Sequence, residues 1–257
     1  MEQTVFLPNG QFDIPCCVTC CEGVPVRQVV LGVHGIGGSK RDAIQQAIAE
    51  EMAMFCDATI LFDLPAHGEN LDDRLTLRGC RETLLTVARY AKERFPGVEE
   101  LCIFATGFGA YVTLCAMEEL MELPGQLRLV VQTPSVRMHN TLLSMTRKSP
   151  QTLRAMGSTV LPVPSRPITV TYDFYEELQE HIVMAPQPIP MLILHGEADD
   201  YIPMEDIRNF RRVNENAKLV YIPGASHQFL EEGAWDMVLD LTRDWFAFQQ
   251  VLLCDWE

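Results

Sequence analysis

The chain has 257 residues, of which 47% are hydrophobic and 21% charged, and its formal net charge is -15. This length and composition are typical of one globular α/β domain with an ordinary core, and they exclude a disordered or repetitive protein. A surface this acidic repels phosphate backbones and anionic lipids, so we expect neither nucleic-acid nor membrane partners.

The hydropathy of the chain and its cysteines both indicate the cellular compartment. No apolar run approaches the roughly 20 residues of a membrane-spanning helix, and the first ten residues, MEQTVFLPNG, lack the features of a secretory signal. The nine cysteines are an odd number, and Cys56, Cys102 and Cys115 lie in apolar segments where thiols act as small hydrophobic groups. We therefore expect a cytoplasmic protein.

Four cysteines cluster near the start of the chain, namely Cys16, Cys17, Cys20 and Cys21. No second pair of cysteines or histidines follows at the spacing of a zinc finger. Alternation along a strand would also point Cys16 and Cys17 to opposite faces. We interpret the cluster as thiols of an early strand rather than as a metal or redox centre, and we expect no metal and no cofactor.

The first sixty residues are predicted to contain four strands and one helix. Three strands are expected first, at residues 4–7, 14–19 and 29–33, with a turn at Pro8-Asn9-Gly10 between the first two. After the segment HGIGG (residues 34–38), Ser39 is the expected N-cap of a helix that presents one apolar face. That face comprises Ile44, Ala47, Ile48 and Met52, and the fourth strand is expected at residues 59–62.

Further along, short apolar strands alternate with amphipathic helices. The strands are predicted at residues 101–105, 127–132, 191–195 and 218–222, and the helices at residues 76–94 and from 108 to about 121. A last helix turns six residues toward the core: Trp235, Val238, Leu239, Thr242, Trp245 and Phe246. This alternation predicts an α/β fold with a mostly parallel sheet covered by helices on both faces.

Residues 133–188 break the rhythm. The stretch is rich in proline and contains one predicted short helix at residues 174–181. We predict a cap or lid at residues 133–188, inserted into a core formed by residues 1–132 and 189–257. An irregular crossover connection is the alternative.

Four short segments carry the signature of one family. They are HGIGG (residues 34–38), DLPAHG (63–68), HGEADDYIP (195–203) and GASH (224–227), and each follows a predicted strand. In this order the chain resembles the α/β-hydrolase superfamily, nearest its branch of small cytosolic esterases and acylglycerol lipases. The resemblance spans residue 29 to the C-terminus and leaves the inserted stretch unmatched.

The resemblance implies roles for individual residues. Asp199 matches the family's catalytic acid, His227 matches its base, and the backbone N–H groups of Ile36 and Phe108 match the oxyanion hole. His34 and His67 are expected only to shape loops. The implied ligand is a small-molecule ester or acyl compound.

The nucleophile is the point of departure from the family. Its motif, glycine-x-serine-x-glycine, should follow the strand at residues 101–105, where this chain reads ATGFGA (residues 105–110). Gly107 therefore takes the serine's place, and glycine has no group that attacks a carbonyl. Thr106 should face elsewhere and Cys102 lies inside the strand, so neither is expected to substitute for the serine.

Three functional hypotheses follow. The chain is of carboxylic ester hydrolase lineage and lacks its nucleophile, through natural loss or a deliberate change, so it should not work as a serine esterase. In the second hypothesis, the chain is a pseudoenzyme that binds a small apolar or carbonyl ligand. In the third hypothesis, the His227–Asp199 pair acts as a general base without a serine. We favour the hydrolase lineage, with present activity and oligomeric state left open.

Overall fold

The computed structural model describes residues 2–21, 23, 25–54, 58–161, 163 and 166–247. Cys56 lies outside these residues. Eight strands form one sheet in the order β1-β2-β4-β3-β5-β6-β9-β10. In chain order they are β1 (Glu2–Asn9), β2 (Phe12–Thr19), β3 (Gln28–Val33), β4 (Ala58–Phe62), β5 (Glu100–Thr106), β6 (Gln126–Gln132), β9 (Met191–Gly196) and β10 (Lys218–Ile222).

The expected mostly parallel sheet is confirmed. β2 runs antiparallel to both β1 and β4, whereas β4, β3, β5, β6, β9 and β10 pair in parallel. Because the carboxyl ends of the parallel strands meet at one edge, the loops that follow them also gather there. We call this the carboxyl edge of the sheet.

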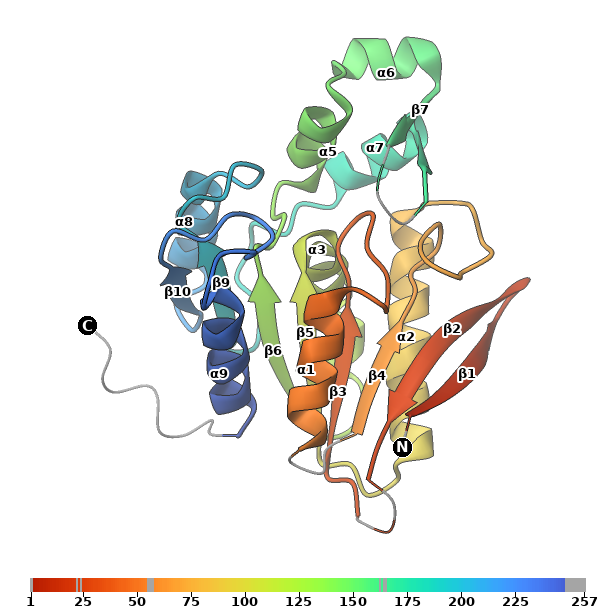
Figure 1. Cartoon of the computed structure of the whole chain (residues 1–257). Helices are drawn as coiled ribbons and strands as arrows, with labels where there is room; N and C mark the ends of the chain where they lie inside the picture. The colour runs from red at the N-terminus through yellow and green to blue at the C-terminus, as the bar shows by residue number, and fades with distance from the viewer. Residues whose placement is uncertain are drawn as a thin grey trace.

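Helices cover both faces of the sheet, as predicted (Figure 1). On one face lie α1 (Ala43–Ala53) and α9 (Ala234–Ala247), whose Ile48 and Val238 pack with Phe104 of β5. On the other lie α2 (Leu77–Arg94), α3 (Gly107–Cys115), α4 (Met117–Met121) and α8 (Met204–Val213). Successive residues of β5, such as Ile103 and Phe104, alternate between the two apolar layers, which is why its apolar run is continuous.

Two helix boundaries were predicted wrongly. The first helix begins at Ala43 with Asp42 as its N-cap, because the backbone N–H of Ser39 bonds the Asp42 carboxylate within a turn that precedes the helix. The predicted helix at residues 108–121 is two helices that meet at Ala116. By contrast, α2 starts after Thr76, whose hydroxyl accepts from the N–H of Gly79, and it ends at the expected residue.

Residues 133–188, which we call the inserted segment, contain more structure than the sequence suggested. They form α5 (Met138–Thr146), α6 (Pro150–Met156), a two-stranded sheet of β7 (Ser158–Leu161) and β8 (Ile168–Thr171), and α7 (Tyr172–Glu180). The predicted short helix corresponds to α7, and the other four elements were missed. In Figure 1 α5, α6, α7 and β7 lie beyond the carboxyl edge, outside the main sheet.

The early cysteines lie where the strand pattern predicts. Cys16 and Cys17 are buried on opposite faces of β2, and burial raises the pKa of their thiols to about 12 and about 11. Within the residues that the structure describes, no group of three or more His, Cys, Asp or Glu side chains is arranged to hold a metal ion. None of the described helices is long and apolar enough to cross a membrane.

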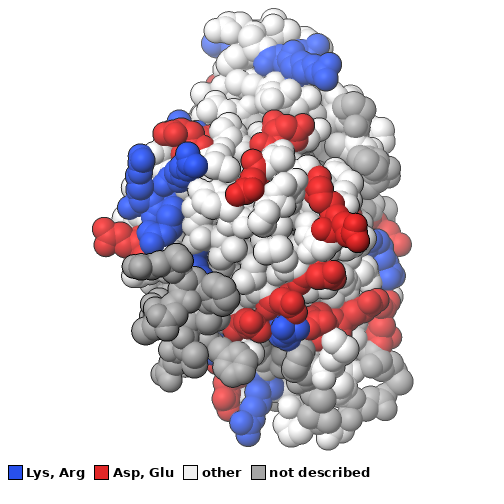
Figure 2. All heavy atoms as spheres, turned by 60° about the vertical axis from the view of Figure 1, so that its left-hand side comes forward, with Lys and Arg blue, Asp and Glu red and all other residues white. Residues whose placement is uncertain are grey.

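Acidic side chains outnumber basic ones across the face shown in Figure 2, where they form several separate groups. This distribution agrees with the net charge of -15.

Candidate active site at the carboxyl edge

Gly107 occupies the turn between β5 and α3. Its φ of +49° is in the left-handed region, which glycine adopts without the steric penalty that a side chain brings. A Cβ built on Gly107 would have one neighbour within 4 Å, the Cα of Gly35 at 3.9 Å. A small side chain at this position would therefore point toward the HGIGG loop and have room there.

The HGIGG loop passes next to the start of α3. His34 donates from Nδ1 to the carbonyl of Gly35 at 2.8 Å and accepts at Nε2 from the N–H of Leu64 at 3.1 Å, so its ring is neutral and fixed. Ile36 follows in this loop. Phe108 lies in the first turn of α3, where backbone N–H groups have no acceptor within the helix. The two expected oxyanion residues thus flank Gly107 from the loop and from the helix.

Close approach between α3 and β3 makes Gly109 sensitive to substitution. A Cβ on Gly109 would lie 2.4 Å from the carbonyl oxygen of His34 and 2.5 Å from that of Val33. We expect Gly109→Ala to lower the free energy of unfolding by about 1–3 kcal/mol, measured by urea denaturation. Gly97→Ala is the control, because its Cβ would meet nothing closer than 3.7 Å. Equal stability of the two variants would contradict the close approach.

The acid and the base predicted from the motifs are hydrogen-bonded. His227 Nδ1 lies 2.9 Å from Asp199 Oδ2, and the other carboxylate oxygen accepts from the N–H groups of Tyr201 (2.8 Å) and Ile202 (2.9 Å). Burial raises the pKa of Asp199, but the hydrogen bonds and charge of His227 and the two backbone bonds outweigh it, so the pKa lies below its ordinary value. Asp199 is therefore an anion that orients a 26% exposed imidazole.

A buried ion pair ties the HGIGG loop to the DLPAHG loop. Lys40 is 1% exposed, and its Nζ donates to Asp63 Oδ2 at 2.6 Å and to Glu69 Oε2 at 2.5 Å. Its backbone N–H donates to Asp63 Oδ1 at 2.7 Å. Burial lowers the pKa of Lys40, but its hydrogen bonds to the two carboxylates raise that pKa by more than burial lowers it. The pKa therefore lies above its ordinary value, and Lys40 remains charged.

The inserted segment is attached to the same edge. The Tyr111 hydroxyl of α3 donates to the carbonyl of His181 at 2.7 Å, and Phe108 packs edge-on against Phe174 of α7 at 6.0 Å between ring centroids. The N–H of Leu77, at the start of α2, donates to Glu177 of α7 at 2.7 Å. These contacts connect α7 with the helix that follows Gly107 and with α2.

A second contact joins the inserted segment to the HGIGG loop. A Cβ on Gly37 would lie 2.6 Å from Val163 Cγ1, so this valine rests directly on the glycine. Arg166 donates to the backbone carbonyl of Asn70 at 3.1 Å and also pairs with Asp73. The inserted segment therefore contacts the HGIGG loop and the segment that follows the DLPAHG loop.

His67 shapes the DLPAHG loop, as expected for this residue. Its Nδ1 donates to the carbonyl of Pro65 at 2.8 Å, and its ring packs against His34 and Phe108. The side chain is fully buried, and burial is the main cause that lowers its pKa to about 3. A histidine in an unfolded chain has a pKa near 6.5.

This difference predicts acid sensitivity. The unfolded chain takes up a proton at His67 below about pH 6.5 and the folded chain does not, so the stability present at pH 7 is lost as the pH falls. Between pH 7 and pH 5 this amounts to about 2 kcal/mol. In His67→Asn, which retains a donor for Pro65, urea unfolding at the two pH values should show a loss smaller by that amount. His181→Asn, an exposed control, should match the unsubstituted chain. If His67→Asn loses as much stability between the two pH values as the unsubstituted chain, His67 is not the cause of the acid sensitivity.

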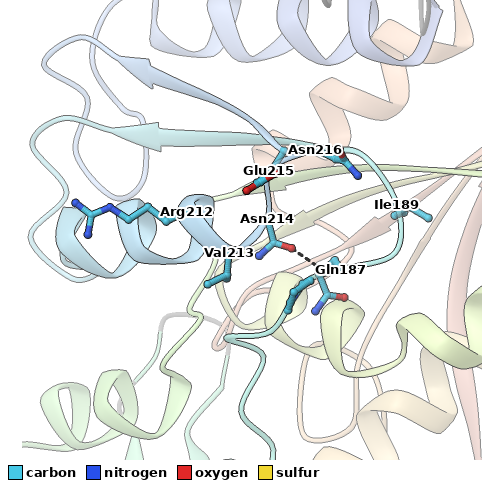
Figure 3. Close-up of a pocket in the computed structure, with 9 residues that line it drawn as sticks. Gln187, Ile189, Arg212, Val213, Asn214, Glu215 and Asn216 are labelled. Carbon is cyan, nitrogen blue, oxygen red and sulfur yellow. Dashed lines mark hydrogen bonds between the residues drawn. The ribbon is translucent and has the colours of Figure 1, made fainter.

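Two pockets lie apart from these residues. One, of about 430 Å³, is lined by the end of α8 and by the segments that lead into β9 and β10 (Figure 3), so it lies at the amino ends of those two strands. Asn214 in it accepts from the N–H of Gln187 at 2.7 Å. The other, of about 350 Å³, lies between the β1–β2 turn and the start of α2. Neither includes Asp199 or His227.

All five site residues expected from the sequence lie in loops or a helix start at the carboxyl edge, and the structure joins His227 to Asp199. Sequence reasoning missed Lys40, Tyr111 and Glu177. A lysine just before a predicted helix, such as Lys40, usually has a solvated side chain. No local pattern identifies its partner Asp63, which lies 23 positions further along the chain. Thr133 was missed too. It is a buried, β-branched residue at the end of β6 with a φ of +43°, a strained conformation of a kind that recurs at functional sites.

No protein-family model and no curated protein sequence matches the chain. Solved structures do. Est1E from Butyrivibrio proteoclasticus with ferulic acid bound has a TM-score of 0.81 at 17% identity, covering 94% of this chain and 97% of that one. A putative hydrolase from Agrobacterium vitis S4 has 0.79 at 17%, covering 95% and 97%. Mouse alpha/beta hydrolase domain-containing protein 10 has 0.76 at 15%, covering 96% and 100%. The chain thus has the α/β-hydrolase fold.

Proposed function

We propose that the chain is a carboxylic ester hydrolase by lineage in which Gly107 takes the nucleophile's position, so that it is inactive as a serine esterase. One observation carries this proposal. Gly107 has a φ of +49° at the junction of β5 and α3, with open space beside it and the HGIGG loop opposite. A strained strand-to-helix turn is where hydrolases of this fold present their nucleophile.

The remaining chemistry of such a site is retained under this proposal. Asp199 orients His227, which would take a proton from the nucleophile, and the N–H groups of Ile36 and Phe108 would stabilise the oxyanion. The ligand is a carboxylic ester or acyl compound of small or medium size, bound beneath a cap formed by residues 133–188. Est1E is known with ferulic acid bound, which makes hydroxycinnamoyl esters worth including among the test compounds.

A second candidate is favoured by one contact. The 2.9 Å hydrogen bond between His227 and Asp199 is intact although no serine is present for it to activate. Such a pair can also remove a proton from water or from a carbon acid, with the oxyanion loop stabilising the product anion. Under this reading turnover occurs in the unsubstituted chain and is lost in His227→Ala.

The test compares the unsubstituted chain with Gly107→Ser on p-nitrophenyl esters of two to eight acyl carbons and on a feruloyl ester. Activity only in the serine variant supports a silenced esterase. Equal activity in both, lost in His227→Ala, supports the general-base reading. Binding of esters without turnover in either form supports a ligand-binding pseudoenzyme and contradicts an intact esterase site.

A further inference from the structure

The carboxylate of Asp199 faces a second imidazole that the proposed chemistry does not use. His195, near the end of β9, is 1% exposed, and its Nδ1 lies 3.9 Å from Asp199 Oδ2. The same oxygen accepts the 2.9 Å hydrogen bond from His227 Nδ1. Two histidines therefore approach one oxygen of a buried carboxylate, and only one of them bonds it.

The contacts of His195 bear on where its proton lies. The backbone of Ile202 lies near the ring and, by favouring its protonated form, opposes the lowering of the pKa of His195 by burial. In the part of the chain that the structure describes, Nδ1 is buried and makes no hydrogen bond. A neutral ring with its proton on Nε2 would point the lone pair of Nδ1 at Asp199. A separation of 3.9 Å is too long for a hydrogen bond, as expected when two acceptors face each other.

The surroundings of His195 oppose a positive charge at neutral pH. Burial lowers the pKa of His195, the Asp199 carboxylate opposes this effect, and the imidazole of His227 adds to the lowering. From β10, the ring of Tyr221 packs edge-on at 6.5 Å between centroids. A proton that enters a ring already protonated at Nε2 must bind Nδ1, and it then points at Asp199 Oδ2.

We propose that His195 is a positioning residue for the Asp199–His227 pair. While neutral, it leaves Asp199 Oδ2 to His227. Once protonated, it donates to the same oxygen and loosens the hydrogen bond that orients His227. The inference rests on the proposed function for the catalytic use of the pair, but the hydrogen bonds belong to the unsubstituted chain and are measurable without turnover.

The first test uses the unsubstituted chain with ¹⁵N-labelled histidine. Nitrogen shifts at pH 7 are expected to show His195 protonated at Nε2 only. As the pH falls, the hydrogen-bonded Nδ1–H signal of His227 should weaken in step with protonation of His195 Nδ1. A proton on Nδ1 of His195 at pH 7 would overturn the proposal. So would a His227 signal that persists unchanged after His195 has become charged.

The second test replaces the switchable ring with a permanent donor. In His195→Asn the amide takes the place of Nδ1 and can donate to Asp199 Oδ2 at every pH. Because a carboxylate shared by two donors stabilises an imidazolium less, the titration midpoint of His227 should fall by about one pH unit. His139→Asn, which changes a half-buried histidine of α5, is the matched control and should leave the midpoint unchanged. A midpoint in His195→Asn equal to the control contradicts the proposal.

The outcomes separate this inference from the proposed function. If Gly107→Ser is inactive on all esters but the histidine signals behave as expected, the proposed function fails and the coupling of His195 stands. If Gly107→Ser is active but the acid limb of its pH–activity profile is the same with and without His195→Asn, the positioning role of His195 fails and the proposed function stands. Should His195→Asn not fold, the tautomer of His195 in the unsubstituted chain still decides.

Discussion

Gly107→Ser is expected to raise the hydrolysis of a short p-nitrophenyl ester by at least about 10³-fold over the unsubstituted chain, measured as kcat/KM at pH 7.5. Under the proposed function, the hydroxyl would be the nucleophile that His227 activates and whose oxyanion the backbone N–H groups of Ile36 and Phe108 stabilise. The space beside Gly107, with Gly35 Cα at 3.9 Å, accommodates a serine side chain.

The substitution also carries a cost. A side chain at a φ of +49° destabilises the turn by about 1–2 kcal/mol, so the serine variant should unfold at a lower urea concentration. Gly107→Ala is the matched control, because it has the same backbone strain and no hydroxyl. It should show the same loss of stability and no gain in activity.

The gain should depend on both members of the pair. His227→Ala in the serine background is expected to return activity to the level of the unsubstituted chain, and Asp199→Asn to remove most of it, because the imidazole loses its orientation. A serine variant that stays active without His227 would contradict the proposed roles, and activity in Gly107→Ala would place the nucleophile elsewhere.

Lys40→Met and Asp63→Asn are each expected to lower the free energy of unfolding by about 3–5 kcal/mol, measured by urea denaturation. The two side chains are 1% and 0% exposed. Removal of Lys40 leaves Asp63 as a buried charge without its cation, and removal of Asp63 leaves Lys40 only the 65% exposed Glu69 as its counter-ion. Lys40 also holds Glu69, and Asp63 also accepts the N–H groups of Lys40 and Glu69. Loss of either partner therefore weakens the contact between the HGIGG and DLPAHG loops, which keeps the hydrogen bond from the N–H of Leu64 to His34.

The double variant identifies the pair as the cause. Lys40→Met with Asp63→Asn should cost less than the sum of the single changes, because the only carboxylate left without Lys40 is that of the exposed Glu69 and no buried unpaired charge remains. Glu82→Gln is the surface control. It breaks the Arg78–Glu82 pair, whose side chains are 84% and 53% exposed, and should change stability by less than about 1 kcal/mol. Additive effects at residues 40 and 63 would mean that the two do not act as a pair.

Much of the fold was predictable from local patterns in the sequence. Apolar runs of four to seven residues between helical periods give a parallel sheet because buried strands need cover on both faces, and β3, β5, β6 and β9 lie within a few residues of their expected positions. The helix predicted at residues 76–94 corresponds to α2, which runs from Leu77 to Arg94 after the capping residue Thr76. Gly107 was located from local signals as well, because a strand, a turn and a helix in succession fix its register.

Elements that depend on distant partners were not predictable. One error was local instead: α1 starts at Ala43, because the Asp42 carboxylate accepts from the N–H of Ser39 and the segment before the helix forms a turn. Apart from the short helix that corresponds to α7, the inserted segment shows no periodicity that separates its helices and hairpin from irregular chain. Its order comes from contacts with the core, such as Glu177 with the N–H of Leu77, exactly one hundred positions away.

The sequence by itself determined the class of fold, the order of the loops at the carboxyl edge and the absence of a nucleophilic side chain at Gly107, because strand periodicity, turn residues and residue identity are written along the chain. Only the tertiary structure decided which side chains meet: His195 beside the carboxylate of Asp199, Lys40 buried against Asp63, and Tyr111 bonded to the carbonyl of His181. Those pairings depend on how the loops and helices approach one another in space, which no local spacing encodes.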